Sequence, residues 1–491
     1  MFKKTSSDSG GTRNELKKGS VGTWQGAFYS LAQVGPAADI AILLIGTFRD
    51  VGFRSVTAVL VAWLIYGLWM ITPYEFSKLR SNAGGYYAYA AASTKSGFYG
   101  PATAFSWLYE NLTSSAFAVL GISSFLFLLS SEISSLKYLW VIFAIGMIVY
   151  VSVIPYLGIR PSVQYTFITG FAEVMFLFVA SIIIIIEVGP GNSFVPFTLP
   201  FSIVPVFFLS MIFSISDFTG IGISTTISEE VTEPKKKIKN SLLLSYLFSG
   251  LALIPATYAL TVGWGISGIG GFASANDPGL IVFERYLGPI GGILLVIFTI
   301  NSYLSNGVAK TNAVSRVWFS ASRDKIIFPK SFSEVHKKYK SPHKAIRAYM
   351  ILMLVINLLF GFLFGPKTGA LILLTGSGIG IIFTHIYANI SLTLYTRTQK
   401  VFKWLVHGLI PIASSIIAAV VIFYTVQQDI LAQISTPSFD NFAYASSAVV
   451  GVIWSFIFAI IISFYYVRKK PKIATEAGTY DADHIKISWD K

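Results

Sequence analysis

The stretch PFSIVPVFFLSMIFSISDFTGIGISTTISEEVTEPKKKIKN (residues 200–240) decides how the rest of the chain is interpreted. It begins as an apolar segment of membrane-spanning length, but its centre holds Asp217 and two glycines, Gly220 and Gly222. In lipid an unsatisfied backbone group is costly, so irregular backbone persists only where it lines a cavity or is buried in protein. An ionisable residue at that depth marks a candidate functional site. We therefore predict that residues 200–227 form a broken transmembrane helix whose gap binds a small solute.

Composition indicates a polytopic membrane protein rather than a soluble domain. Of 491 residues, 54% are hydrophobic and 12% are charged, whereas soluble domains average about 25% charged residues. The chain has no cysteine, which excludes disulfides, thiolate metal ligands and thiol nucleophiles. Its five histidines are too scattered for a metal cluster, so we predict neither a metal site nor a cofactor.

Apolar segments of spanning length follow one another along the chain. A helix needs about 20 residues to cross roughly 30 Å of hydrocarbon, and twelve segments approach or exceed that length. Their approximate ranges are 24–47, 54–78, 99–130, 138–156, 162–187, 200–227, 240–265, 289–320, 346–364, 368–395, 403–426 and 442–467. We therefore predict an all-α polytopic membrane protein with twelve transmembrane helices.

The lysines and arginines predict how these helices are oriented. With the N-terminus in the cytoplasm, about 30 of the 37 basic residues fall in cytoplasmic loops and tails, and about five fall on the other face. This bias predicts a multi-pass protein of the cell membrane with both termini cytoplasmic. The net charge of +14 therefore reflects orientation, and no nucleic-acid partner is expected.

A second interrupted segment lies in the first span, which reads GAFYSLAQVGPAADIAILLIG (residues 26–46). It is broken at Gly35-Pro36, because proline removes a helix hydrogen bond. The first and sixth spans are five helices apart, which is an odd number. Spans 1–5 and spans 6–10 therefore cross the membrane in opposite orientations. We predict inverted repeats over residues 21–187 and 200–397. The remaining parts are a disordered cytoplasmic tail at 1–20, two further helices within 402–467 and a cytoplasmic tail at 468–491.

The two breaks offer opposite electrostatic poles to a solute. A broken helix exposes free N–H groups where its second half begins and free carbonyl groups where its first half ends, and each end carries about half a unit charge. The N–H groups near Pro36 and Ala37 suit a carboxylate, and the carbonyl groups around Ser214–Asp217 suit an ammonium group. A site with both poles fits a zwitterionic α-amino acid.

Three separated motifs resemble those of the amino acid–polyamine–organocation (APC) superfamily, in particular its amino acid permeases. Residues 74–89 (YEFSKLRSNAGGYYAY) are similar to its acid–aliphatic–proline–Gly-Gly-x-Tyr signature, with Asn82 where proline is usual. Residues 218–235 (FTGIGISTTISEEVTEPK) resemble its sixth-helix motif and the following acidic-Pro-Lys loop, and residues 315–342 resemble the end of its eighth helix and the next loop. The first helix departs from the pattern, because GPAAD (residues 35–39) replaces the usual Gly-Ser-Gly-Ile-Phe type of break.

This resemblance implies a five-plus-five inverted repeat of the leucine-transporter type and transport by alternating access. It also implies that backbone groups of the first and sixth helices bind the substrate's carboxylate and amino group. The positions that match the family's substrate contacts are Val34, Gly35, Pro36 and Ala37 in the first helix and Ser214, Ile215, Ser216, Asp217 and Phe218 in the sixth. Phe218 matches the aromatic gate of many relatives. From the breaks themselves we add Gln33, Asp39 and Gly220 to the predicted site.

Ionisable residues within the spans are the candidates for substrate binding and coupling. Asp39 could bind a cation or a proton, or it could cap a half-helix. Asp217 could bind a cationic group or carry a proton. Glu173 in the fifth span is expected to pair with Lys310 in the eighth, either for coupling or as a structural ion pair. Glu110 in the third span either faces the cavity or bonds to another helix.

Four charged residues lie where the sixth and eighth spans meet the predicted cytoplasmic face. They are Glu229, Glu230, Arg323 and Asp324. They could form a solvated rim, or they could form salt bridges of an inner gate that break when the gate opens.

The leading interpretation is a secondary active transporter for amino acids, acting by proton-coupled import or by exchange, and not an enzyme. A channel would need a continuous polar stripe, a membrane-embedded enzyme would need paired catalytic groups, and a sensor would need an effector domain. Polyamines and other organic cations are the alternative substrates, since Asp39, Asp217 and Glu110 would favour them. The expected partners are therefore a small-molecule substrate, protons and the lipid bilayer.

Overall fold

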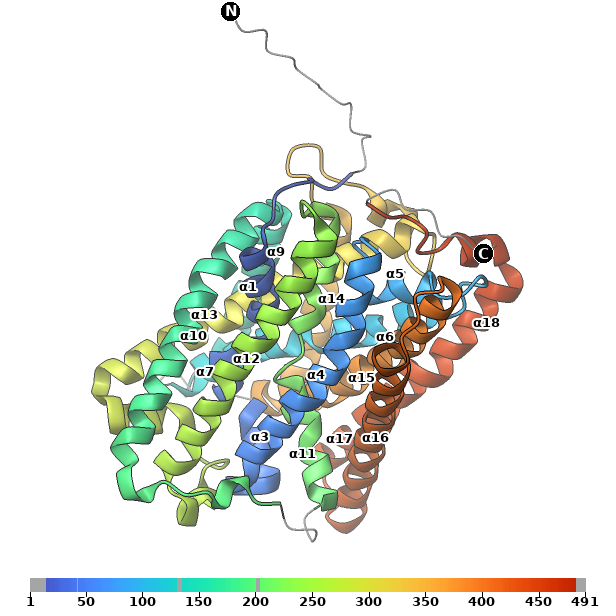
Figure 1. Ribbon diagram of the computed structural model, residues 1–491. Helices are drawn as coiled ribbons and strands as arrows, with labels where there is room; N and C mark the ends of the chain where they lie inside the picture. Colours follow the sequence, from blue (N-terminus) through green and yellow to red (C-terminus); the bar gives the residue numbers. More distant parts are fainter. Residues whose placement is uncertain (1–14, 42, 130–134, 200–203, 483–491) are drawn as a thin grey trace, which may run out of the picture.

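The computed structural model describes residues 15–41, 43–129, 135–199 and 204–482. The predicted disordered tail is outside these ranges up to residue 14, as are residues 200–203 of the sixth span and residues 483–491 of the C-terminal tail. The described part of the chain is all-helical and has no strand. Its long helices lie side by side in one bundle (Figure 1).

The helices follow the order of the predicted spans. The first half of the chain contains α1 (Thr23–Val34), α2 (Pro36–Ala41), α3 (Leu43–Val51), α4 (Ser55–Leu79), α5 (Tyr86–Ala91), α6 (Tyr99–Thr113), α7 (Ser115–Leu128), α9 (Leu139–Tyr156) and α10 (Ile159–Val188). The second half contains α11 (Val204–Ser216), the 3₁₀ helix η5 (Ile221–Glu230), α12 (Pro234–Trp264), α13 (Pro278–Arg323), α14 (His343–Phe364), α15 (Pro366–Thr398), α16 (Ile410–Ser435), α17 (Phe439–Val452), α18 (Ala459–Lys469) and α19 (Pro471–Glu476).

Ten segments of the described chain are long and apolar enough to cross a membrane. The sequence predicted twelve, and the difference arises where predicted spans consist of shorter helices. The first span is divided into α1 and α2 at Gly35, and the third is divided into α6 and α7 at Ser114. None of these four helices exceeds 15 residues, which is short of the roughly 20 that a spanning helix needs. The count of twelve stays a prediction.

The sixth span is interrupted where the sequence predicted. The helix α11 ends at Ser216, the chain turns, and η5 continues from Ile221 to Glu230. A 3₁₀ helix of 10 residues is unusually long, since 3₁₀ runs beyond about four residues are uncommon and often mark a functional hinge. The segment is therefore an irregular part of the bundle held in place by its neighbours.

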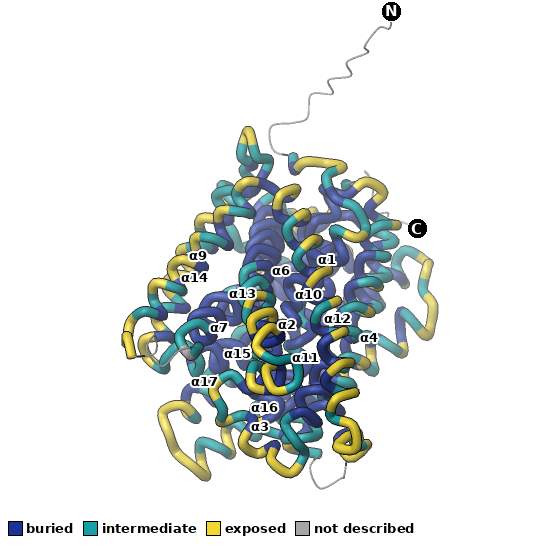
Figure 2. The backbone as a smooth tube through the Cα atoms, turned by 90° about the vertical axis from the view of Figure 1, so that its left-hand side faces the viewer, coloured by how far each residue is buried: buried dark blue, intermediate teal, exposed yellow. Residues whose placement is uncertain are grey.

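Burial separates central helices from peripheral ones. In the most apolar window of each span, α15 is 94% buried and Val204–Glu230 is 72% buried, whereas α13, α14 and Phe439–Lys469 are each 28% buried. The tube in Figure 2 is accordingly buried through its middle and exposed along its flanks. The exposed residues of the peripheral helices are largely apolar, as expected for surfaces that face lipid. The interrupted sixth span thus lies in the protein interior, which is where irregular backbone can persist.

Candidate functional site

The two predicted breaks meet in the structure. In the first, α1 ends at Val34, and Gly35 adopts the left-handed conformation (φ +76°, ψ +56°) before α2 begins at Pro36. In the second, Gly220 has a φ of +134° between α11 and η5. A Cβ atom at Gly220 would lie 2.8 Å from the carbonyl carbon of Gln33. Glycine therefore allows the two interrupted helices to touch backbone to backbone.

Replacing Gly220 by alanine should destabilise this contact. The added Cβ meets the Gln33 backbone, and the positive φ strains an L-residue, so we expect the free energy of unfolding to fall by about 1–3 kcal/mol. Thermal unfolding of the purified protein in detergent measures the change. Gly146→Ala in α9 is the matched control, because its Cβ meets no atom of the described residues within 4 Å. An equal loss of stability in both variants would contradict the prediction.

The first N–H group of α2 is bound by a carboxylate of the protein itself. Glu173 on α10 accepts hydrogen bonds through Oε1 from the backbone N–H of Ala37 (2.9 Å) and from Ser302 Oγ on α13 (2.8 Å). Free N–H groups at a helix start need such an acceptor. The expected pairing of Glu173 with Lys310 is wrong, because Glu173 Oε1 accepts from donors on α2 and α13 while Lys310 is paired with Glu110.

Lys310 pairs instead with Glu110. Its Nζ lies 2.5 Å from Glu110 Oε1, and the two side chains are 7% and 0% exposed. The ion pair joins α13 to α6 and lets each charge be buried with a partner, as a protein interior requires. Glu110 thus bonds to another helix, and it also lines a cavity.

A cavity of about 30 Å³, which is room for about two water molecules, lies beside this ion pair. It is lined by Gln33, Val34, Leu43, Glu110, Ser114, Phe117, Ser216, Thr219, Asn306, Lys310, Leu374 and Ser377. Four of these residues carry a buried polar atom that has no hydrogen-bond partner in the described part of the chain: Gln33 Oε1, Glu110 Oε2, Ser114 Oγ and Thr219 Oγ1. Each of these atoms can accept a hydrogen bond. The cavity is therefore suited to a group with several donors, such as an ammonium group.

Asp39 and Asp217 lie at the two breaks, and both are fully buried. None of their four carboxylate oxygens has a hydrogen-bond partner among the described residues, so the Asp39 side chain does not cap α2. Asp217 and Glu173 are both close enough to Asp39 for their charges to act on its carboxyl group. Burying unpaired carboxylates is costly. The two aspartates therefore require protons or a cationic group.

Residues of the predicted substrate site divide into two groups. Gln33, Val34 and Ser216 line the cavity. Phe218 is buried and packs near Tyr66, with ring centroids 6.4 Å apart, and it is not one of the lining residues. The remaining members are buried at or near the breaks: Gly35, Pro36, Ala37, Asp39, Ser214, Ile215, Asp217 and Gly220.

Other lining residues were missed by the sequence reasoning. These are Leu43, Ser114, Phe117, Thr219, Asn306, Leu374 and Ser377. Asn306 donates a hydrogen bond from Nδ2 to the carbonyl oxygen of Gln33, which joins α13 to the first break. The sequence does contain a pattern that predicts Asn306 as a lining residue. Asn306 and Lys310 are polar residues one helical turn apart in a largely apolar span, so they share a face of the helix.

Buried ion pairs close the end of the bundle near which the described N-terminal residues and α19 lie (Figure 1). Arg316 on α13 binds Glu230 through Nε (2.5 Å to Oε2) and through Nη2 (3.0 Å to Oε1). Arg323 Nη2, about two turns further along α13, lies 2.9 Å from Glu229 Oε1. We call these four residues the charged cluster. The side chains of Arg316 and Glu230 are 0% and 1% exposed, whereas those of Arg323 and Glu229 are 23% and 5% exposed. The charged cluster is therefore packed at Arg316 and Glu230 and partly open to solvent at Arg323.

The fold is that of a polytopic membrane protein, in which apolar helices enclose a small polar cavity beside two facing helix breaks. A family model described as amino acid permease matches residues 21–475, and the chain belongs to this family. The match confirms the resemblance to the APC superfamily. The family and the fold are those of transporters and not of enzymes.

Two curated relatives are similar to part of the chain. The low-affinity putrescine importer PlaP of Escherichia coli, in strains K12 and O157:H7, is 29% identical over 147 residues. The match covers 30% of this chain and spans only 31% of the length of each relative.

A solved structure shares the fold over most of both chains. It is a crystal structure of a manganese transporter from Eremococcus coleocola, in complex with an aromatic bis-isothiourea substituted compound. The TM-score is 0.52 at 12% identity, and the alignment covers 95% of this chain and 99% of that chain. This likeness is one of fold alone.

Proposed function

We propose that this permease is a secondary active transporter that moves amino acids across the cell membrane by alternating access. Its twelve transmembrane helices would form inverted repeats over residues 21–187 and 200–397, with both termini in the cytoplasm. One observation carries the proposal: two buried carboxylates, Asp39 and Asp217, lie where two interrupted helices meet, and neither has a hydrogen-bond partner among the described residues. An ammonium group placed there would satisfy carboxylates that are otherwise costly to bury.

Amino acids with a second amino group fit these contacts best. One ammonium group would lie at Asp39 and Asp217, and another would meet the acceptor atoms of Gln33, Glu110, Ser114 and Thr219 in the cavity. Lys310 would supply a positive charge for the substrate carboxylate from the same cavity wall. Basic amino acids combine all three groups in one molecule.

A diamine is the second candidate substrate. The N–H group of Ala37, where the sequence predicted a substrate carboxylate, already donates to Glu173. A solute with two ammonium groups and no carboxylate would not need that N–H group. The partial similarity to proteins named as putrescine importers supports the same class.

Counterflow into liposomes separates the two candidates. Purified protein is reconstituted into vesicles loaded in turn with unlabelled lysine, alanine, glutamate or putrescine, and uptake of the same labelled solute is followed. The proposal expects counterflow of lysine above that of alanine or glutamate. Counterflow of putrescine alone would establish the second candidate and overturn the amino-acid proposal. Protein-free vesicles and the Asp217→Asn variant are the controls.

Glu173 is the candidate for proton coupling, because it links α2, α10 and α13 through one carboxylate oxygen. Glu173→Gln keeps an acceptor for Ala37 and Ser302 but removes the titrating proton. We expect this variant to lose accumulation driven by an imposed pH gradient while its counterflow persists. Glu187→Gln is the matched control, because Glu187 is exposed at the C-terminal end of α10. Unchanged pH-driven accumulation in Glu173→Gln would contradict the coupling role.

A further inference from the structure

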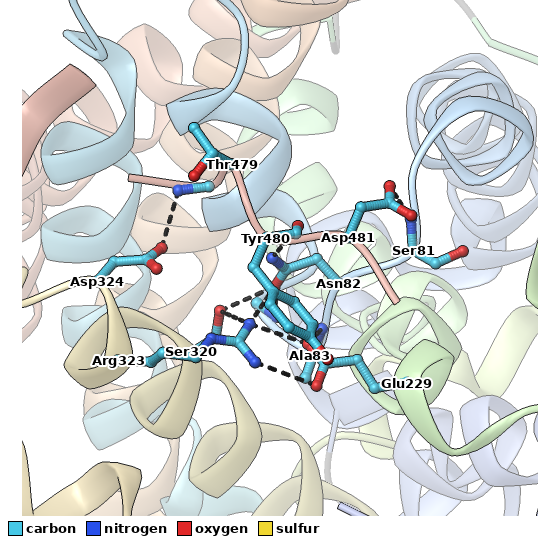
Figure 3. Close-up of polar contacts among 12 residues, drawn as sticks. Ser81, Asn82, Ala83, Glu229, Ser320, Arg323, Asp324, Thr479, Tyr480 and Asp481 are labelled. Atoms are coloured by element: carbon cyan, nitrogen blue, oxygen red, sulfur yellow. Dashed lines mark hydrogen bonds and ion pairs between the residues drawn. The ribbon is translucent and has the colours of Figure 1, made fainter. Parts of the chain in front are cut away.

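The segment that follows α18 lies across the end of the bundle that the charged cluster closes. We call residues 471–482, which include α19, the C-terminal strap. Figure 3 shows the strap passing between Asp324 on one side and Ser81 on the other, with Tyr480 over Arg323. The strap therefore contacts two regions that are far apart in the sequence.

Arg80, at the end of α4, holds the first side of the strap. Its Nη2 lies 2.8 Å from the carbonyl oxygen of Gly478, 3.2 Å from that of Thr479 and 2.9 Å from that of Tyr480. Its Nε lies 3.3 Å from Asp481 Oδ2. Arg80 is only 1% exposed. Charge-assisted hydrogen bonds of this kind are stronger than neutral ones, so the strap is bound specifically and does not merely lie on the surface.

The end of α13 holds the second side. The backbone N–H of Gly478 donates to Asp324 Oδ2 (2.8 Å), and the guanidinium carbon of Arg323 lies 3.8 Å from the centre of the Tyr480 ring. This is cation–π geometry. Asn82, just after Arg80, donates from Nδ2 to the carbonyl oxygen of Tyr480 (2.9 Å). The strap thus connects the end of α13 to the loop after α4.

Two glycines make the fit of the strap close. Gly478 has a φ of +68°, and a Cβ atom there would lie 2.5 Å from the carbonyl oxygen of Ala88 on α5. On the opposing surface, a Cβ atom at Gly97 would lie 1.8 Å from the carbonyl oxygen of Ala474 on α19. A side chain at either position would displace the strap, because both obstructing atoms belong to the backbone.

We infer that the C-terminal strap is an inhibitory latch that must leave its seat before this end of the bundle can open. A path from the central cavity to this end requires α13 to separate from η5 and from the loop after α4. Glu229 joins all three, since its carboxylate accepts from Arg323 and from the backbone N–H of Ala83 (2.9 Å). The strap binds α13 and the loop after α4 at the same place, so it stabilises the closed arrangement.

The latch is a separate matter from the identity of the substrate. Among the described residues, none of the strap contacts given above involves a residue that lines the central cavity. A short terminal segment is also the kind of element that can open locally while the rest of the fold persists. An experiment on the latch therefore needs no transported solute.

The chain has no native cysteine, so one introduced thiol reports on opening. Ser228→Cys is the reporter: Ser228 is 2% exposed, directly before Glu229 in η5. The reagent is a membrane-impermeant cationic methanethiosulfonate, applied to purified full-length protein in detergent. Ser181→Cys, buried in α10 away from the charged cluster, is the second reporter and should stay unlabelled in every variant.

The latch predicts faster labelling when the strap is released. In the Ser228→Cys background, Gly478→Ala, Gly97→Ala and Tyr480→Ala should each raise the labelling rate about tenfold, a size typical of coupling between two sites. Lys472→Ala, which changes an exposed strap residue, should leave the rate unchanged. For a chain truncated after residue 470, a synthetic peptide of residues 471–491 should restore slow labelling.

Equal labelling rates in the parent chain and in all three release variants, with their melting temperatures unchanged, would overturn the latch. Faster labelling of Ser181→Cys in the same variants would also overturn it, because it would indicate general loosening of the fold. If the parent chain shows no counterflow of any tested solute, that result counts against the proposed function and does not affect the inference about the latch.

Discussion

Arg316→Leu should lower the free energy of unfolding by about 3–5 kcal/mol, because it leaves Glu230 as a buried charge without its partner. Arg316 binds both carboxylate oxygens of Glu230, at 2.5 and 3.0 Å. The two side chains are 0% and 1% exposed, so water cannot replace the lost partner. Denaturant or thermal unfolding of the purified protein in detergent measures the loss.

The double variant Arg316→Leu with Glu230→Leu should recover most of that stability. Replacing both members of a buried ion pair by apolar residues is often neutral or stabilising. An exposed pair provides the control: Lys344 and Glu334 are 2.6 Å apart and 40% and 47% exposed, so Lys344→Leu should cost at most about 1 kcal/mol. If the double variant is as unstable as Arg316→Leu alone, the loss in the free energy of unfolding comes from altered packing and not from the unpaired charge of Glu230.

Asp217→Asn should weaken substrate binding more than any other single change at the breaks. If the carboxylate binds a substrate ammonium group, removing its charge costs about 2–5 kcal/mol, which corresponds to a roughly 30- to 4,000-fold loss of affinity. The asparagine has nearly the same shape, so the fold should persist. Initial uptake rates over a range of concentrations, with whichever solute gives counterflow, measure the effect as a raised KM.

Asp440→Asn is the control for this substitution. Asp440 is exposed at the start of α17, so its loss of charge should leave the uptake kinetics unchanged. Asp39→Asn should weaken binding in the same direction as Asp217→Asn, because the two carboxyl groups lie near each other. An unchanged KM in both Asp39→Asn and Asp217→Asn would exclude the aspartates from substrate recognition.

The helical bundle and the positions of its breaks could be predicted because they follow from lipid solvation. Apolar segments of sufficient length become spanning helices, and Gly35-Pro36 and Gly220 interrupt them for local backbone reasons. These are properties of single residues and their immediate neighbours. The structure accordingly has α1 end just before Gly35 and α11 end at Ser216.

The partners of the buried charges could not be predicted in the same way. Glu173 bonds to Ala37 and Ser302, and Lys310 bonds to Glu110. All four helices involved carry other polar residues, so several different pairings were possible from the sequence. Choosing among such partners requires the rotation of each helix about its axis. These spans are apolar on nearly every side, so their hydrophobic pattern does not indicate that rotation.

The packing of the C-terminal strap against the bundle could not be predicted from the sequence for a different reason. Residues 471–482 are mixed in character and carry charges, which is equally typical of a solvated cytoplasmic tail. What distinguishes them is the fit of Gly478 against α5 and of Ala474 against Gly97. Such steric fit between distant parts of a chain has no signature in the local sequence.

The small volume of the central cavity has a consequence for how affinities will be measured. The cavity of about 30 Å³ has room for about two water molecules, which is less than an amino acid needs. We therefore expect a ligand to bind only those protein molecules that have already opened. The measured Kd is then the intrinsic Kd divided by the open fraction, and an open fraction of about 1% makes binding look about a hundredfold weaker. A substitution that merely favours opening will therefore look like an improved binding site, although no contact with the ligand has changed.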